Sequence, residues 1–435
     1  MKVGAAQVEI TPPLGLPMDG YGPRTASGIH DPLLARALVA EGTDGTGVAL
    51  VVADLLHIDT RLQSIIAAGI TAATGVPRKR MQLVGTHTHS GPAFPEPSPV
   101  EQEIGDAVAG AAARAWAERR GAAVAVGVGT LTGVGANRRP DGGPVDDRVT
   151  VARFDALDGA PIATLVNYGC HPTTLGPNNT LYSADYPGVA CRLVAGEIGG
   201  VAMFTTGPQG DVNPGGYSPE GSMIGIVVPW RTFESADRYG SLVSATALGA
   251  YRRLEPQPAD DVWGVSRELH LARKPLPEAR RARAAADAAA EAAAAIREAG
   301  LSEDAIYHSA AGAAYADLLA VQAADPERDG PVRLRVSALG FGLFTHVGVQ
   351  GEPFVVLGQR IREQLDPDRT CIAALCDGTV GYIPTAESFA EGGYEPNASV
   401  LRPGEGERLV NEVVSMVRER RRTSAAAAGQ HAGGA

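Results

Sequence analysis

The sequence predicts an α/β fold with mixed β-sheets, and the order of apolar segments in the first half of the chain is the main evidence. Residues 47–56 (GVALVVADLL) form an apolar, β-branched run typical of a buried strand. The next segment opens with Thr60 and Gln63, the spacing of a capping box, and reaches Gly75, a usual helix end. A second strand is expected at 81–86 (MQLVGT). This order favours a strand, a covering helix and a neighbouring strand.

The remaining segments extend the same pattern over a chain long enough to bury a large core. The chain has 435 residues, of which 44% are hydrophobic. A helix is expected from about Pro99 to Arg120. Further short, β-branched segments predict strands at 149–154, 162–168, 201–205, 332–339 and 343–349. Functional side chains of α/β folds gather at the carboxyl ends of strands, so a site is expected there.

We expect one catalytic α/β domain over residues 1–423, interrupted by an alanine-rich segment at about 275–325. Within that segment, Gly300 followed by Ser302, Glu303 and Asp304 reads as a helix stop and a new cap, which predicts a helical hairpin. The hairpin is read as a packing or dimerisation element, with a lid over an apolar pocket as the alternative. Residues 424–435 lack bulky side chains and are expected to be disordered.

Composition excludes several classes of partner. The formal charge of −11 and the pI near 5.4 argue against binding to nucleic acid or anionic membranes. Neither an export signal nor a membrane-spanning segment is recognised, so a cytoplasmic protein without stable membrane insertion is expected. The four cysteines are expected to be buried thiols. The expected partner is a small-molecule substrate, and a homo-oligomer is compatible with the sequence.

Histidines follow two of the predicted strands. His87 and His89 lie in GTHTHSGP (85–92), and residues two apart on a strand point the same way, so both are expected to face one site. His171 ends a strand in NYGCHPTTLGP (167–177). Polar strand-end residues with purely structural contacts are the alternative for each histidine.

Two further segments place oxygen ligands at strand ends. Glu352 lies between a strand and a helix in VGVQGEPFVVLGQRI (347–361), where a helix N-terminus also stabilises a carboxylate. The glycine-rich loop CDGTVGYIPT (376–385) exposes Asp377 and Tyr382. Two histidine nitrogens and a carboxylate form a common catalytic zinc set with an open position for water. Zn²⁺ is therefore the expected metal.

A series of short motifs carries a family resemblance. They are, in chain order, ITPP, GTHTHSGP, ANRRP, NYGCHPT, GPQGDVNP, QGEPF, GTVGYIP and GGYEP. In this order they resemble the catalytic domain of the neutral (alkaline, non-lysosomal) ceramidase family over roughly residues 3 to 400. The resemblance implies a mixed-sheet zinc hydrolase fold with zinc ligands at His87, His171, Glu352 and Tyr382. It implies catalytic roles for His89 as general acid/base, Arg138 as the holder of the carbonyl oxygen, and Tyr394 as a second tyrosine.

One motif departs from the family. Where ceramidases have serine in GDVSP, this sequence has Asn213 in GDVNP. Aromatic residues make up only 5% of the chain, and the further sandwich-like domain of secreted ceramidases is not expected at this length. The predicted reaction is hydrolysis of an N-acyl amide bond of a small or polar cytoplasmic compound by metal-activated water. The alternatives are a ceramidase-like lipid amidase, an acyl transferase using the same site, and a non-catalytic metal-binding scaffold.

Three other polar residues have structural readings. Asp54 ends a strand and is expected either to bond a site histidine or to close a turn. Asp211, in GPQGDVNP, is expected to cap a turn. His346 has no assigned function, although it lies on the strand that leads to Glu352.

Overall fold

The computed structural model describes residues 1–139, 142–215, 230–300, 303–326 and 328–432. The strands of its largest sheet are β1 (Lys2–Glu9), β3 (Leu34–Glu41), β4 (Gly47–Ala53), β5 (Met81–Gly85), β6 (Arg120–Thr130), β8 (Arg148–Ala156), β9 (Pro161–Tyr168), β11 (Val201–Thr206) and β13 (Gln257–Pro258). They are ordered β11-β9-β8-β6-β1-β3-β4-β5, and β13 pairs with β6. Parallel pairs (β4 with β5, β9 with β11) and antiparallel pairs occur together, so this sheet is mixed.

A second sheet and three short ribbons complete the strands. The second sheet contains, in order, β14 (Val262–Leu271), β15 (Val332–Phe341), β16 (Phe344–Val349) and β18 (Thr370–Ala373). The ribbons pair β2 (Gly28–Ile29) with β10 (Leu181–Tyr182), β7 (Gly135–Asn137) with β12 (Val212–Pro214), and β17 (Glu352–Pro353) with β19 (Tyr382–Ile383).

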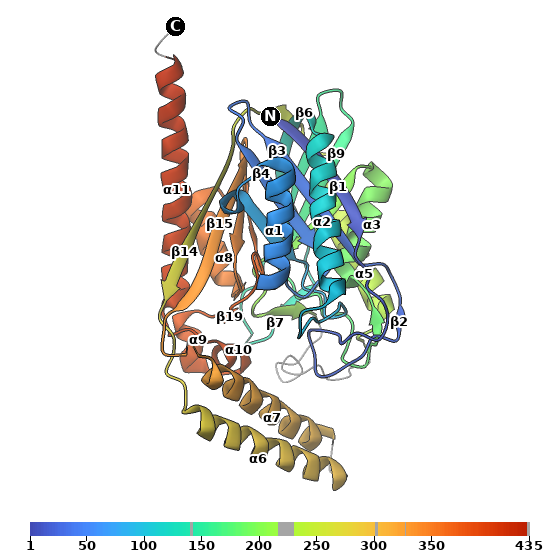
Figure 1. Ribbon diagram of the computed structural model, residues 1–435, viewed down its shortest axis with the longest axis vertical. Coiled ribbons are helices and arrows are strands. Elements are labelled where there is room, and N and C mark those ends of the chain that lie inside the picture. Colours follow the sequence, from blue (N-terminus) through green and yellow to red (C-terminus); the bar gives the residue numbers. More distant parts are fainter. Residues whose placement is uncertain (140–141, 216–229, 301–302, 327, 433–435) are drawn as a thin grey trace.

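The helices lie on the outer faces of the two sheets and at one end of the molecule (Figure 1). They are α1 (Thr60–Thr74), α2 (Pro99–Ala117), α3 (Asp185–Ile198), α5 (Phe233–Tyr251), α6 (Ala279–Glu298), α7 (Glu303–Ala324), α8 (Val355–Leu365), α9 (Ala386–Glu391), α10 (Tyr394–Ala398) and α11 (Glu405–Ala432), with the short 3₁₀ helix η1 (Arg78–Arg80).

Alternate side chains of the central strands pack into different cores. In β4, Leu50 and Val52 share a cluster with Leu339 and Phe344 of the second sheet, so the two sheets pack face to face. Val51, one position along β4, belongs instead to the cluster beneath α1 and α2. A further cluster packs α8 and α11 on the second sheet. The layers are therefore helices, sheet, sheet and helices.

The predicted α/β class with mixed sheets is confirmed, and the elements fall close to their expected positions. The parallel pairing of β4 with β5, joined through α1, matches the strand, helix and strand read from residues 47–86. The helix cap is one residue earlier than expected, because the Asp59 side chain accepts a hydrogen bond from the Leu62 backbone N–H. Gly75 ends α1 with a φ of 72°, as its position predicts.

The sequence predicted a helical hairpin at about 275–325 and disorder at 424–435, and the structure describes most of both segments. The helices α6 and α7 occupy the alanine-rich segment and contact each other, with Arg283 bonding Asp317 across the pair. Ser302, expected as a cap, lies outside the described residues. The structure differs from the expected disorder at the C-terminus, since α11 continues to Ala432. Alanine has the highest helix propensity, which favours this extension. Residues 433–435 lie outside the described part.

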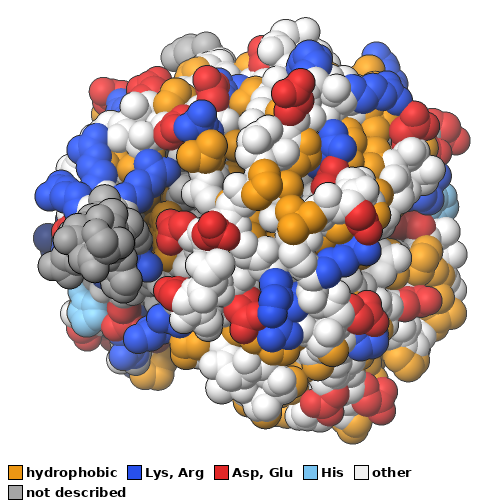
Figure 2. Space-filling model, turned by 90° about the horizontal axis from the view of Figure 1, so that it is seen from above, with side chains coloured by type: hydrophobic (Ala, Val, Ile, Leu, Met, Phe, Trp, Pro, Cys, Tyr) orange, Lys and Arg blue, Asp and Glu red, His pale blue; other side chains and the backbone are white. Residues whose placement is uncertain are grey.

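The cysteines and the charged side chains of the surface were also considered in the sequence. All four cysteines are buried, free thiols, as expected. Figure 2 shows acidic and basic side chains interspersed over the face that it displays. Among the described helices, none is both long and apolar enough to cross a membrane.

Candidate metal centre

The predicted site residues collect where the strands of both sheets reach their carboxyl ends. His87 follows β5 and His171 follows β9 in the larger sheet, whereas Glu352 and Tyr382 follow the strands β16 and β18 of the second sheet. Backbone hydrogen bonds join these ends: the Ala374 N–H donates to the Thr206 carbonyl oxygen at 2.9 Å. The face-to-face packing of the sheets thus brings four distant segments of the chain together.

The two histidines of GTHTHSGP do not share a strand face, and that prediction is wrong in its geometry. Strand β5 ends at Gly85. The backbone of His87 has a φ of 71°, in the left-handed region that residues other than glycine rarely adopt. A Cβ on residue 85 would lie 2.7 Å from the His57 Cα, so only glycine lets the neighbouring segment pass this closely. The turn still leaves the ring centroids of His87 and His89 only 4.8 Å apart.

The centre of the site is a buried group of His87, His171 and Glu352. One ligand atom from each lies within 4.8 Å of the others. The Glu352 Oε2 atom is 3.0 Å from His171 Nε2 and 3.5 Å from His87 Nε2. The residues are 4%, 1% and 7% exposed for His87, His171 and Glu352 respectively. Two imidazoles and a carboxylate converging at this spacing form a donor set suited to zinc.

Backbone carbonyl groups orient both imidazoles. His87 Nδ1 lies 3.0 Å from the Leu56 carbonyl oxygen, and His171 Nδ1 lies 3.0 Å from the Val212 carbonyl oxygen. A carbonyl oxygen only accepts, so Nδ1 carries the proton in each ring and the lone pair of Nε2 faces the centre. Histidines that bind metals commonly have this support from a second hydrogen bond. The residues therefore fit a metal ion.

The electrostatics of the group favour the protonation states that bind metals. Burial and the charge of Arg138 lower the pKa of His171 to about 4, against the opposing effect of Glu352. Burial would raise the pKa of Glu352, but the neighbouring His87 and His171 outweigh it and hold that pKa well below its usual value. At neutral pH the imidazole of His171 is thus neutral and the carboxylate is charged.

The ribbon of β17 and β19 places Tyr382 directly opposite Glu352. The Tyr382 and Tyr394 rings lie 5.5 Å apart, and Arg138 Cζ lies 5.4 Å from the centre of the Tyr382 ring. Burial raises the pKa of Tyr382 well above its ordinary value and also raises that of Tyr394. All seven predicted site residues, His87, His89, His171, Arg138, Glu352, Tyr382 and Tyr394, therefore belong to one connected group.

His89 lines the same site beside a loop that the sequence analysis missed. Among the described residues, neither ring nitrogen of His89 has a hydrogen-bond partner. Burial together with His87 and His171 holds its pKa well below the usual value. The Tyr21 ring lies 4.8 Å from the imidazole, and Arg24 Nη2 donates to the His89 carbonyl oxygen at 2.6 Å. Gly20 has a φ of 92°, and a Cβ there would lie 2.5 Å from the His89 ring. The glycines of MDGYGP were the available signal for this close approach.

The two aspartates named in the sequence analysis both have partners outside the histidine group. Asp54 does not contact a site histidine, because Arg36 Nη1 and the Leu34 N–H donate to its carboxylate. Asp211 accepts from the Val355 N–H at 2.8 Å, at the start of α8. Its carboxylate therefore satisfies an N–H at the start of the helix that follows Glu352, which differs from the expected cap of a turn in its own segment.

The α6–α7 hairpin lies at the same end of the molecule as the site (Figure 1). Gln322 on α7 donates through Nε2 to the Ala398 carbonyl oxygen at 2.8 Å. Ala398 ends α10, the short helix that begins with Tyr394. The hairpin is thus attached directly to an element of the site.

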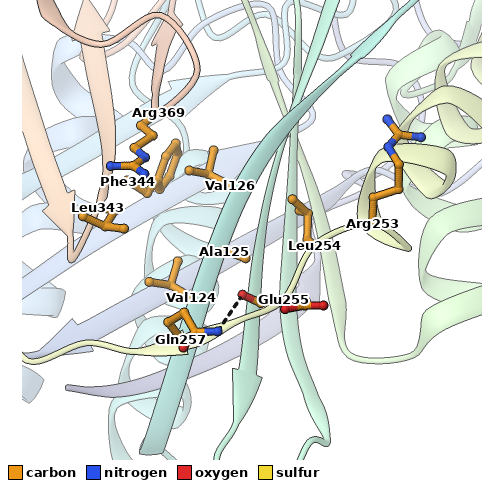
Figure 3. Close-up of a pocket in the computed structure, with 10 residues that line it drawn as sticks. All are labelled: Val124, Ala125, Val126, Arg253, Leu254, Glu255, Gln257, Leu343, Phe344 and Arg369. Carbon is orange, nitrogen blue, oxygen red and sulfur yellow. Dashed lines mark hydrogen bonds between the residues drawn. The ribbon is translucent and has the colours of Figure 1, made fainter.

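A cavity of about 330 Å³ lies elsewhere, between the strand β6 and the turn before β16 (Figure 3). Its walls include Val124, Val126, Leu254, Phe344 and Arg369. None of the seven predicted site residues lines it, and no cluster of metal-binding side chains accompanies it among the described residues. The chemistry therefore belongs to the histidine group and not to this cavity.

Comparison with known proteins supports the family resemblance. No family model matches the chain. Neutral ceramidase A from Dictyostelium discoideum is 27% identical over 262 residues, which are 50% of this chain and 36% of that protein. Neutral ceramidase from Drosophila melanogaster is 25% identical over 331 residues, 62% of this chain and 47% of that protein.

Solved structures share the fold. Neutral ceramidase from Pseudomonas aeruginosa superposes with a TM-score of 0.74 at 19% identity, covering 96% of this chain and 74% of that one. A ceramidase complexed with C2 gives a TM-score of 0.75 at 20% identity, covering 96% of this chain and 75% of that one. The chain spans between 32% and 47% of the length of the curated relatives that it matches. In sequence the chain resembles neutral ceramidases, and it shares the fold of their solved structures.

Proposed function

We propose that the chain is a zinc-dependent amidohydrolase that cleaves the N-acyl bond of a small or polar cytoplasmic compound. The observation that carries the proposal is the buried convergence of His87, His171 and Glu352, with both imidazoles oriented by backbone carbonyl groups. The relatives named as neutral ceramidases support amide-bond hydrolysis as the reaction class.

In this proposal His87, His171, Glu352 and Tyr382 hold the metal. A bound zinc ion would supply a Lewis acid that activates water and polarises a carbonyl group. The pairing of Glu352 with Tyr382 across the β17–β19 ribbon supports the tyrosine as the fourth ligand.

His89 moves protons in the proposed reaction. Its low pKa keeps the ring neutral at pH 7, so one nitrogen can accept a proton from the attacking water. The resulting imidazolium then returns that proton to the leaving amine nitrogen. The absence of a hydrogen-bond partner on either nitrogen, within the described part of the chain, leaves the ring available for both steps.

Arg138 and Tyr394 act on the carbonyl oxygen. The guanidinium is close enough to the centre for its charge to lower the pKa of His171, so it also favours negative charge developing on the substrate oxygen. The raised pKa of Tyr394 keeps its hydroxyl group protonated, and a protonated hydroxyl donates a hydrogen bond to the same oxygen.

A ceramidase-like lipid amidase is the second candidate. The names of the relatives favour it, as does the position of the α6–α7 hairpin, which is attached at Ala398 to the helix that carries Tyr394. In this version the hairpin would cover the acyl chain of the substrate. Transfer of the acyl group to an amine instead of water would use the same residues.

The test is amine release from a series of N-acyl amides, from N-acetyl compounds to ceramide, by zinc-supplemented protein. We expect turnover that falls at least 100-fold in His89→Ala, because general acid–base catalysis contributes about 10²–10⁴-fold. His270→Ala, which removes an exposed histidine, is the matched control and should retain wild-type turnover. Preference along the series separates the two candidates, and no turnover of any member would refute both.

A further inference from the structure

The guanidinium of Arg138 is held by an acceptor on each of its nitrogens. Nε donates to Glu395 Oε1 at 2.6 Å, Nη1 to Asn213 Oδ1 at 2.9 Å, and Nη2 to the Gly210 carbonyl oxygen at 2.8 Å. Arg138 is buried, with 4% of the residue exposed. Arginine has five N–H groups, so these three bonds leave one N–H on each terminal nitrogen. Tyr382 also forms a side-chain hydrogen bond with this guanidinium. The plane of the guanidinium is thus fixed while one N–H stays available.

The carboxylate of Glu395 supports this arrangement from the side opposite Asn213. Its second oxygen accepts from Arg139 Nη1 at 3.1 Å, so one buried carboxylate lies between two buried guanidinium groups. Glu395 directly follows Tyr394 at the start of α10. The helix of the second site tyrosine is thereby tied to Arg138.

Asn213 reaches Arg138 because Arg138 directly follows β7, the strand that pairs with the strand of Asn213. The strands β7 and β12 are antiparallel with Val212 opposite Asn137, and the Arg138 N–H donates to the Asp211 carbonyl oxygen at 2.9 Å. The Asn213 side chain is buried, with 1% of the residue exposed. A serine hydroxyl here would be one bond shorter and would lie farther from the guanidinium. The departure from the family motif therefore changes what holds Arg138.

We propose that Asn213 is a positioning residue: its side-chain oxygen fixes the Arg138 guanidinium so that the remaining N–H faces the carbonyl or carboxylate oxygen of the bound substrate or product. The inference rests on the proposed function, since it assigns a geometry to the same reaction. It differs from a packing role, because removal of Asn213 then acts only through Arg138.

The test is a double-mutant cycle on binding of acetate, which carries the two oxygens of an acid product. Acetate affinity is measured by calorimetry on the zinc-loaded protein for wild type, Asn213→Ala, Arg138→Met and the double variant. We expect Asn213→Ala to weaken acetate binding about 10-fold in the wild-type background, and less than about 2-fold when Arg138 is already methionine. Zinc affinity, measured separately, should be the same in wild type and Asn213→Ala.

A matched control and a conservative variant keep the cycle decisive. Asn167 is another buried asparagine, bonded through Nδ2 to the Thr205 and Ile372 carbonyl oxygens, and Asn167→Ala should show no such coupling to Arg138→Met. Asn213→Asp keeps the acceptor oxygen and should retain acetate binding better than Asn213→Ala, even if the alanine variant is poorly folded.

The results that overturn the proposal are distinct from those that overturn the proposed function. Equal effects of Asn213→Ala in both Arg138 backgrounds, or wild-type protein that binds zinc but not acetate, would refute the positioning role. Acetate binding with the expected coupling, but no amide turnover, would retain the role of Asn213 and reject amide hydrolysis.

Discussion

His346 provides a quantitative test of the core between the two sheets. Its ring is fully buried, Nδ1 lies 2.6 Å from Gln82 Oε1, and Nε2 has no hydrogen-bond partner in the part of the chain that the structure describes. Because the amide oxygen of Gln82 only accepts, a second proton would have to reside on Nε2, without an acceptor. Burial accordingly lowers the pKa of His346 to about 3, from about 6.5 in an unfolded chain.

The sign of the pH effect follows from these two pKa values. Between pH 6.5 and 3 the unfolded chain binds a proton that the folded protein does not, so the free energy of unfolding falls as the pH falls. The full difference of about 3.5 pKa units corresponds to about 5 kcal/mol, and the part lost between pH 7 and pH 4.5 is about 2.5 kcal/mol.

The perturbation is His346→Asn, which keeps a donor near Gln82 and removes the titration. Urea unfolding is measured at pH 7 and pH 4.5, and the wild type should lose about 2.5 kcal/mol more than the variant over this interval. His270→Asn, at an exposed histidine, should follow the wild type. If His346→Asn and the wild type lose the same free energy, the histidine is not the buried neutral group described above.

Two further predictions concern other parts of the structure. Gly20→Ala places a methyl group 2.5 Å from the His89 ring, on a backbone with a φ of 92° that alanine rarely adopts. Amide turnover should therefore fall about 10-fold or more, with zinc content unchanged. Wild-type turnover in this variant would contradict the close packing of Gly20 on His89. Arg36→Met removes the ion-pair partner of the buried Asp54 carboxylate and should lower the free energy of unfolding, measured in urea, by about 3–5 kcal/mol. The double variant Arg36→Met/Asp54→Leu should regain much of this loss. A loss below about 1 kcal/mol in Arg36→Met would contradict the buried ion pair.

Regular elements were predictable because their signals are local. The apolar run that became β4 and the glycine that ends α1 specify a strand and a helix end within a few residues. The face-to-face packing of the two sheets is not visible in this way, since Leu50 and Leu339 share one core although almost three hundred positions separate them in the sequence. The C-terminal extension of α11 was missed because its alanines have little side-chain surface to pack, which suggested disorder. Their high helix propensity favours a helix nevertheless.

The site residues were predictable for a different reason. Their motifs and their family resemblance identify His87 and Glu352. Strand periodicity, in contrast, predicted that His87 lies on a strand, whereas β5 ends two residues before it. The left-handed backbone of His87 depends on Gly85 and the segment packed against it, which no local pattern reveals. The loop that brings Gly20 to His89 was missed because it is far from the site in sequence. The role of Asn213 likewise appears only when the ribbon of β7 and β12 is formed.

The central claim is that His87, His171 and Glu352 hold a metal ion, and elemental analysis of purified, zinc-supplemented protein tests it most directly. We expect about one zinc per chain in the wild type and in His270→Ala, and loss of that zinc in His87→Ala and in Glu352→Ala. A wild-type protein that binds no zinc, or variants at His87 and Glu352 that retain it in full, would contradict the claim.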